Sequence, residues 1–165
     1  MDPVSDEVKA YEPDRSWKGK LRRRLVRLQA RRPLTTAPDR PMVSFSFDDA
    51  PLTAATTGAE ILEARGLRGT FFVSAALSGT QAPMGLCARA GDYHRLAEAG
   101  HEIACHTHSH LDCGQATGRE ALIDVARNER VLQAWGLEAP RTFAYPYGDV
   151  AKGPKAALSS RFSIL

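Results

Sequence analysis

The sequence predicts an α/β fold in which parallel strands alternate with helices. Apolar residues alternate with polar ones over 43–47, and later apolar runs are separated by segments with helix caps and closing glycines. The composition, 43% hydrophobic and 25% charged in 165 residues, suits a single globular domain and excludes collagen-like, disordered and coiled-coil classes. Such alternation implies a parallel sheet, either open and doubly wound or closed as a barrel.

The strands follow from the apolar runs. Val43, Phe45 and Phe47 alternate with serines, which predicts the first strand. Further strands are expected at 69–73, 102–105 and 142–145, with the opening of a fifth at 161–165. No glycine-rich phosphate loop follows the first strand, and neither GxGxxG nor GxxxxGK[ST] occurs, so nucleotide binding has no support.

Helices are expected between these strands. Two capping boxes, each followed by a closing glycine, mark two of them: Thr57 with Glu60 and Gly66, and Thr117 with Glu120 and Gly136. Two more helices are expected at 92–99 and 149–158. The stretch 74–91, rich in small residues, is expected to be a long loop over the site.

Charge divides the chain into a basic leader at 1–40 and a folded body at 41–165. Residues 18–40 hold nine Lys or Arg against the single acid Asp39, whereas the rest of the chain is acidic. A basic leader on an acidic body is not typical of a nucleic-acid binder, so no nucleic-acid partner is expected. The sequence shows no signal peptide and no transmembrane segment, which predicts a cytoplasmic protein.

The leader contains one helical pattern. Leu21, Leu25 and Leu28 recur at helical spacing among arginines, which predicts a short basic amphipathic helix. Residues 18–32 could lie on an anionic membrane surface, but a solvated arm is the commoner role of such a segment and is preferred.

Cysteine usage argues against a disulfide framework. The three cysteines, Cys87, Cys105 and Cys113, are odd in number and form no CxxC pair. Buried free thiols are expected, and a closed structural Cys/His zinc site is disfavoured.

Two groups of residues could carry metal chemistry. Asp48 and Asp49 end the first strand, although a helix cap or turn explains such a pair equally well when it is taken alone. His106 and His110 follow the third strand at i, i+4, so one helical turn would bring both imidazoles to a common metal. His108 would point away from that pair. The isolated His94 and His101 are expected to be surface or core residues.

A third segment, FAYPYGD at 143–149, follows the fourth strand as a rigid turn that could aim a backbone N–H into a cavity. The carboxyl ends of successive parallel strands are where α/β barrels and open α/β sheets place their active sites. One Asp and two His with an open position form a catalytic type of metal site that can activate water.

Residues 42–165 resemble the NodB-homology polysaccharide deacetylases, carbohydrate esterase family 4. The [ST]FDD motif of that family is present as Ser46-Phe47-Asp48-Asp49, and its H[ST]xxH motif spans His106 to His110. Its third motif, an Arg-Pro-Pro-Tyr-Gly-like turn, is matched loosely at 144–148. The resemblance implies a distorted (β/α) barrel of the glycoside hydrolase/deacetylase type, incomplete in this chain.

The resemblance also implies a role for each matching residue. Asp49, His106 and His110 would hold a divalent metal, usually zinc, with cobalt, nickel or manganese as alternatives. Asp48 would be the base that takes a proton from the attacking water, and the N–H of Tyr147 would help to stabilise the oxyanion. The substrate would be an N-acetylated or O-acetylated sugar polymer or oligosaccharide.

The sequence departs from the family pattern in two ways. The arginine that orients the base falls at Ala144 here, and Arg141 is near but out of register. The later motifs, including the histidine that acts as general acid, have no counterpart in these 165 residues, so the chain is expected to be the N-terminal two-thirds of the domain.

Two other functions remain open at this stage. One is a non-catalytic metal-binding or glycan-binding remnant, and the other is a different carbon–nitrogen hydrolase of the amidase type on the same fold.

Overall fold

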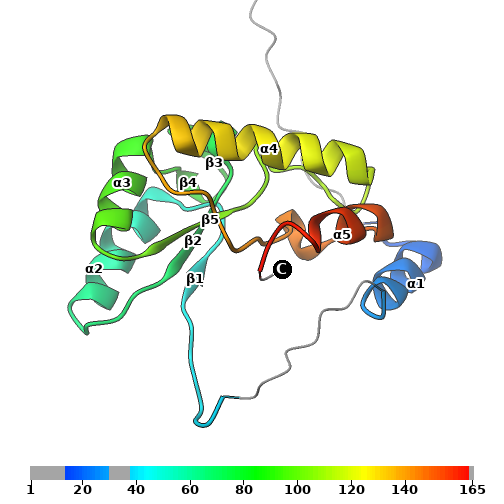
Figure 1. The fold of residues 1–165 in the computed structure, drawn as a ribbon, viewed down its shortest axis with the longest axis horizontal. Helices are drawn as coiled ribbons and strands as arrows, with labels where there is room; N and C mark the ends of the chain where they lie inside the picture. The colour runs from blue at the N-terminus through cyan, green and yellow to red at the C-terminus, as the bar shows by residue number, and fades with distance from the viewer. Residues whose placement is uncertain (1–13, 30–37, 164–165) are drawn as a thin grey trace, which may run out of the picture.

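The computed structural model describes residues 14–29 and 38–163. Helices alternate with short strands along the chain (Figure 1). The helices are α1 (Trp17–Val26), α2 (Ala59–Glu63), α3 (Ala90–Glu98), α4 (Gly118–Ala134) and α5 (Lys152–Leu158), with short turns η1 (Ala54–Gly58), η2 (Ala75–Leu77) and η3 (Pro146–Gly148). The strands are β1 (Ser46–Phe47), β2 (Thr70–Val73), β3 (Gln81–Ala82), β4 (Gly85–Leu86) and β5 (Glu102–Cys105).

The main sheet is parallel, and its strands follow one another in chain order. β1 pairs with β2 and β2 with β5, in the order β1-β2-β5. A parallel bridge between Cys105 and Phe143 extends this order by one more segment. An open doubly wound sheet reverses its strand order at a switch point, whereas a barrel keeps chain order. The described sheet therefore has the barrel type of progression.

The helices enclose two apolar cores. Phe71 and Val73 of β2 meet α3 through Tyr93 and Leu96 and the end of α4 through Leu132. A second cluster joins β5, α4, α5 and the segment after α5: Cys105, Cys113, Ala121, Val125, Phe143, Leu158 and Phe162. All three cysteines are buried and free, as the sequence predicts.

A buried asparagine ties α4 to the sheet. The Asn128 side chain, fully buried, accepts a hydrogen bond from the N–H of Ala75 at 2.9 Å and donates one to the carbonyl of Val73 at 2.9 Å. These are the backbone groups at and just beyond the carboxyl end of β2. Because a buried polar group is stable only when it is paired, this residue fixes how α4 crosses the strand ends.

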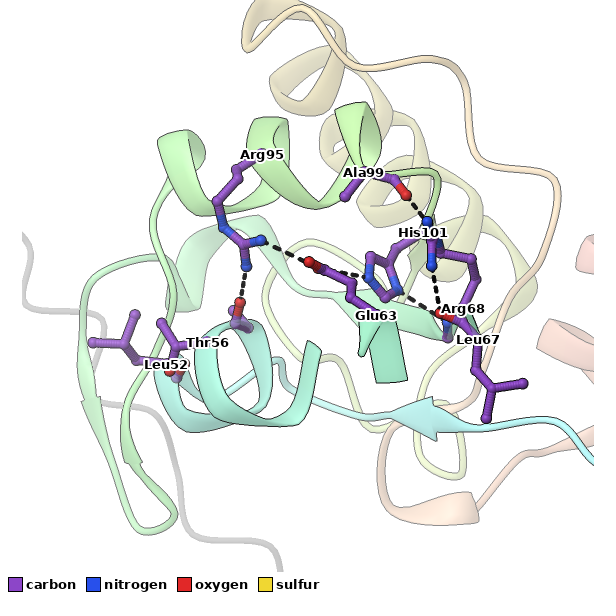
Figure 2. Close-up of polar contacts among 10 residues, drawn as sticks. Leu52, Thr56, Glu63, Leu67, Arg68, Arg95, Ala99 and His101 are labelled. Atoms are coloured by element: carbon purple, nitrogen blue, oxygen red, sulfur yellow. Dashed lines mark hydrogen bonds and ion pairs between the residues drawn. The ribbon is translucent and has the colours of Figure 1, made fainter. Parts of the chain in front are cut away.

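The opposite end of the sheet is closed by a polar cluster, which Figure 2 shows. His101 accepts a hydrogen bond from the N–H of Gly69 at 3.0 Å through Nδ1, which leaves its Nε2–H to face Glu63 at 3.1 Å. Arg95 of α3 reaches the same Glu63 carboxylate at 3.3 Å. The cluster joins the end of α2, α3 and the starts of β2 and β5. His101 is thus a satisfied core histidine, as expected.

Two elements at the amino-terminal side differ from the sequence prediction. β1 covers only Ser46–Phe47, because within the described residues it is the edge strand; Met42 and Val43 are 76% and 81% exposed. The capping box at Thr57 does not form. The helix starts earlier, with Ala54 and Ala55 donating to the carbonyl of Pro51, and Thr57 lies within η1.

Later segments also differ. The stretch 74–91 is not a structureless loop, since it contains η2 and the β3–β4 hairpin. The segment 142–145 makes one bridge to Cys105 and then meets Pro146, which cannot donate to a ladder. Residues 161–163 form a turn in place of the expected fifth strand, and 164–165 lie outside the described residues.

The predicted basic helix exists as α1, but it is not a solvated arm. α1 lies beside α5 at one side of the molecule (Figure 1). The amine of Lys155 donates to the carbonyl of Val26 at 2.8 Å, and Arg22 donates to the carbonyl of Gly114 at 2.7 Å. In the part of the chain that the structure describes, no helix is long and apolar enough to cross a membrane.

Candidate metal centre

Asp49, His106 and His110 converge at the carboxyl ends of β1 and β5. One possible ligand atom from each lies within 4.8 Å of the others. The Nε2 atoms of His106 and His110 are 3.6 Å and 2.9 Å from Asp49 Oδ1. Two residues from one loop and one from another thus meet, although 57 positions separate Asp49 from His106 (106 − 49).

The backbone around this cluster is strained. Within residues 14–29 and 38–163, five non-glycine residues have positive φ: Asp49 (59°), Ala50 (41°), Thr107 (63°), His110 (57°) and Tyr147 (61°). Four of the five fall in the three segments that the sequence singles out for chemistry, and the fifth, Ala50, directly follows Asp49. A left-handed conformation costs a non-glycine residue about 1 kcal/mol or more, and such strain collects at functional sites.

A backbone carbonyl group fixes the orientation of the His106 ring. Its Nδ1 lies 2.8 Å from the carbonyl oxygen of Ala144. A carbonyl oxygen can only accept, so Nδ1 carries the proton and Nε2 presents a lone pair to Asp49 and His110. Burial, the main cause, lowers the pKa of His106, which keeps the ring neutral. A neutral imidazole whose other nitrogen donates to a carbonyl is the usual state of a metal-binding histidine.

Asp49 is ionised in this setting. Burial acts to raise the pKa of its carboxyl, but contact with His110 and the nearby His106 outweigh burial and hold the pKa below the ordinary value. Its Oδ1 is buried without a hydrogen-bond partner, although His110 Nε2 is only 2.9 Å away. The two atoms are close but are not aligned as donor and acceptor.

This set of residues fits a divalent metal. Zinc binds imidazole nitrogen and carboxylate oxygen at about 2.0–2.2 Å, which in a tetrahedral site separates ligands by about 3.3 Å. The separations of His110 Nε2 and His106 Nε2 from Asp49 Oδ1, 2.9 Å and 3.6 Å, bracket that value. The unpaired Asp49 Oδ1 and the neutral His106 supply the electron pairs that a cation needs.

The loop from His106 to His110 is not helical, so the helical-turn interpretation of the sequence is wrong. Thr107 and His110 are left-handed, and Thr107 Oγ1 accepts from the N–H of Leu111 at 2.8 Å. The i, i+4 spacing still brings the two imidazoles together, with ring centroids 5.1 Å apart. A tight loop, rather than a helix, makes this approach.

Asp124 of α4 holds the same loop from outside the cluster. Its Oδ1 accepts from the N–H groups of His108 and Ser109 at 2.6 Å and 3.0 Å, and its Oδ2 accepts from Ser109 Oγ at 2.8 Å. Sequence reasoning missed Asp124, because nothing in a helical sequence indicates which loop will pack on it. His108 itself is not among the three possible ligands.

Asp48 and Tyr147 lie near the cluster in different ways. Asp48 directly precedes Asp49, is exposed, and makes no side-chain hydrogen bond or ion pair within the described residues. Tyr147 sits in η3, and its ring packs edge-on against His110 with centroids 4.4 Å apart. All three segments thus adjoin one another. Arg141 does not join them: it lines a cavity of about 430 Å³ with His101 and Glu102, at the other end of the sheet.

Comparison with known proteins gives a consistent match. A family model described as Polysaccharide deacetylase matches residues 35–160. Chitin deacetylase 1 of Cryptococcus neoformans var. grubii serotype A is 25% identical over 117 residues, which cover 71% of this chain and 23% of that protein.

Solved structures share the fold. The chitin deacetylase from Colletotrichum lindemuthianum has a TM-score of 0.62 at 22% identity, covering 73% of this chain and 53% of its own. IcaB from Ammonifex degensii has a TM-score of 0.67 at 24% identity, covering 77% of this chain and 59% of its own. A mutant of BA3943, described as a CE4 family pseudoenzyme, has a TM-score of 0.62 at 18% identity, covering 78% of this chain and 45% of its own.

These similarities confirm the predicted distorted (β/α) barrel type. This chain spans about a quarter of the length of the curated relative and between 45% and 59% of the three solved chains. Since one of those chains is a pseudoenzyme, the fold by itself does not decide activity.

Proposed function

Because the chain belongs to the polysaccharide deacetylase family, we propose that it serves the metal-dependent removal of acetyl groups from an N-acetylated or O-acetylated saccharide. The observation that carries this proposal is the convergence of Asp49, His106 and His110 within 4.8 Å, on backbone that is strained at two of the three. The site lies at the carboxyl ends of parallel strands, where barrel enzymes do their chemistry.

Metal binding and proton transfer belong to different residues of the site. Asp49, His106 and His110 hold a divalent metal, with zinc the best match to two imidazoles and one carboxylate. When bound, such a metal lowers the pKa of water and polarises a carbonyl oxygen. Asp48, exposed beside Asp49, accepts the proton of the attacking water.

Tyr147 completes the site. We assign to its backbone N–H a hydrogen bond to the acetyl oxygen as that oxygen gains negative charge. The support is the position of its turn, since the Tyr147 ring contacts His110. Water adds to the acetyl carbon, the bond from that carbon to the sugar nitrogen or oxygen breaks, the leaving nitrogen or oxygen takes up a proton, and acetate leaves.

Zinc titration calorimetry on chelator-treated protein tests the metal part of this proposal. We expect one zinc per chain, lost in Asp49→Ala, His106→Ala and His110→Ala. His94→Ala is the matched control, because this exposed histidine is paired with Glu98 and lines the cavity at the other end of the sheet. Equal zinc binding in the His106→Ala variant and the native chain would falsify the site.

Acetate release tests the chemical part, with N-acetylglucosamine oligomers and acetylated xylan as separate substrates. Asp48→Asn should bind zinc normally and lose activity about 100-fold or more, as expected for loss of a general base. Zinc binding without acetate release by the native protein would reject catalysis.

A non-catalytic metal-binding or glycan-binding protein is the second candidate. Among the described residues, none forms a hydrogen bond or ion pair that orients the Asp48 side chain, which favours this candidate. This candidate predicts zinc binding and saccharide binding with no acetate released.

A further inference from the structure

The helix α1 turns charged side chains toward the protein and apolar side chains toward solvent, the reverse of an ordinary surface helix. The face toward the protein carries Gly19, Arg22, Arg23 and Val26, which recur at i, i+3, i+4 and i+7. Arg22 and Arg23 lie 3.0 Å and 3.7 Å from Oδ2 of Asp149, whose side chain is only 4% exposed. Charge and hydrogen bonding, rather than an apolar stripe, therefore hold this helix against the protein.

The apolar stripe of α1 points to solvent. Trp17, Leu21, Leu25 and Leu28 are 70%, 46%, 47% and 68% exposed. At 100° per residue the three within α1, Trp17, Leu21 and Leu25, span an arc of about 80° on the side away from Arg22 and Arg23, and Leu28 follows the end of the helix. A surface helix normally buries such a stripe, so an exposed one indicates an interaction surface.

Cations border the stripe on both sides. Lys18 lies on one side of it, and Lys20, Arg24 and Arg27 lie on the other; all four are exposed. No acidic residue occurs between 15 and 28. The outward face of α1 therefore combines exposed Trp and Leu side chains with four exposed cations.

We propose that this face of α1 binds an anionic lipid surface. An interfacial helix lies in the headgroup region with Trp and Leu inserted and with Lys and Arg toward anionic headgroups, which is the arrangement found here. The charge discriminates against other occupants. A second copy would bring the same cations into repulsion, and a nucleic acid would leave the apolar stripe unused.

The docking contacts give this surface a fixed place on the protein. Asp149 directly follows η3, which holds Tyr147 against the metal cluster. α1 is therefore anchored at the same end of the fold as the candidate metal centre. The proposal does not depend on the proposed function, since none of its residues belongs to that centre.

Vesicle flotation tests the proposal with the whole chain. We expect binding to vesicles that contain phosphatidylglycerol and little binding to pure phosphatidylcholine. Lys20→Gln and Arg24→Gln should each weaken binding about five-fold, as expected for loss of one charge near an anionic surface. Leu21→Ala with Leu25→Ala should weaken it about ten-fold or more.

Tryptophan fluorescence supplies an independent readout. The sequence has two tryptophans, Trp17 and Trp135, and the second stacks on buried Tyr93. In a Trp135→Phe variant, Trp17 emission should shift to the blue with anionic vesicles only. Ile61→Ala is the matched control, because it removes an apolar side chain of 50% exposure from α2 and should leave binding unchanged.

Four results of these experiments would contradict binding of α1 to an anionic lipid surface. No binding, equal binding to neutral vesicles, or equal loss in Ile61→Ala and the leucine variants would each overturn the proposal. So would a concentration-dependent dimer that the leucine variants abolish, since the stripe would then bind a second copy. Circular dichroism verifies that each variant keeps its fold.

Discussion

The histidine loop shows how single residues outside the cluster set its geometry. Thr107 and His110 are left-handed, a conformation that is uncommon for any non-glycine residue and an outlier for the β-branched Thr107. Two side chains supply the compensating hydrogen bonds: Thr107 to the N–H of Leu111, and Asp124 to the N–H groups of His108 and Ser109. The strained loop exists because these acceptors fix its backbone.

The first prediction concerns Asp124. Asp124→Ala removes the acceptor of two backbone N–H groups between the two histidines, so the imidazoles lose their fixed separation. We expect zinc affinity to fall about 10-fold or more, within the range found for groups that orient metal ligands. Calorimetry measures the affinity, and circular dichroism checks that α4 is intact.

Ser109→Ala is the matched control for Asp124. It removes only the hydroxyl contact to Asp124 Oδ2 and keeps both backbone hydrogen bonds to Oδ1. We expect nearly native zinc affinity. A loss as large as that of Asp124→Ala would mean that the backbone contacts do not position the ligands.

At the scale of elements, local signals located the helices well and the irregular segments poorly. β5 and the capped helix α4 lie where the sequence predicts them, and the Thr117–Glu120 capping box forms. The capping box expected at Thr57 fails, because the turn after Asp49 and Ala50 starts the helix earlier. A local signal is reliable only where no tertiary contact competes with it.

In the candidate site, too, local signals were reliable only where no tertiary contact decided the conformation. Spacing paired His106 with His110, and the family resemblance added Asp49, so the three residues that converge were named from the sequence. Their conformation was not predictable, because it depends on Asp124 and on the carbonyl of Ala144, which come from other segments. The docking of α1 through Arg22 and Asp149 was hidden for the same reason.

The second prediction uses the cluster that joins α2 to α3. The hydrogen bond from His101, opposed by partial desolvation and aided by Arg95, holds the pKa of Glu63 below its ordinary value of 4.5. A lowered folded-state pKa stabilises the protein above the unfolded pKa, and this stabilisation is lost as pH falls through the folded pKa. Glu63 thus contributes to stability at neutral pH and loses that contribution in acid.

Glu63→Gln should therefore be less stable than the native chain at neutral pH, with a smaller loss of stability on acidification. Urea unfolding from neutral pH to about pH 3 measures both free energies. Glu60→Gln, on the exposed side of the same helix, should keep the native pH dependence. Parallel curves for Glu63→Gln and the native chain would exclude a role for this ion cluster.

Across the whole molecule, the two ends of the sheet have different roles, one structural and one carrying the candidate metal centre. The starts of β2 and β5 are closed by paired polar groups around Glu63, whereas the strand ends carry strained loops and an unpaired carboxylate oxygen. Stability is thus concentrated at one end and candidate chemistry at the other, as in barrel enzymes. α1 adds a third unit, attached to the end with the candidate metal centre.

The last prediction concerns this attachment. Arg22→Ala removes hydrogen bonds to Gly114 and Asp149 and leaves the buried Asp149 with Arg23 as its remaining partner on α1. Loss of one partner of a buried charge is costly, and partial exposure of the arginine reduces that cost. We expect amide hydrogen exchange within α1 to accelerate about ten-fold while β2 and α4 keep their protection.

Arg24→Ala distinguishes docking from helix formation. Arg24 lies on the same helix with the same intrinsic propensity but faces solvent. If attachment through Arg22 orders α1, Arg24→Ala will leave its exchange unchanged, because the inward contacts persist. Equal acceleration in both variants would show that α1 is ordered by its own sequence, and the fixed position of the exposed Trp and Leu stripe would lose its structural basis.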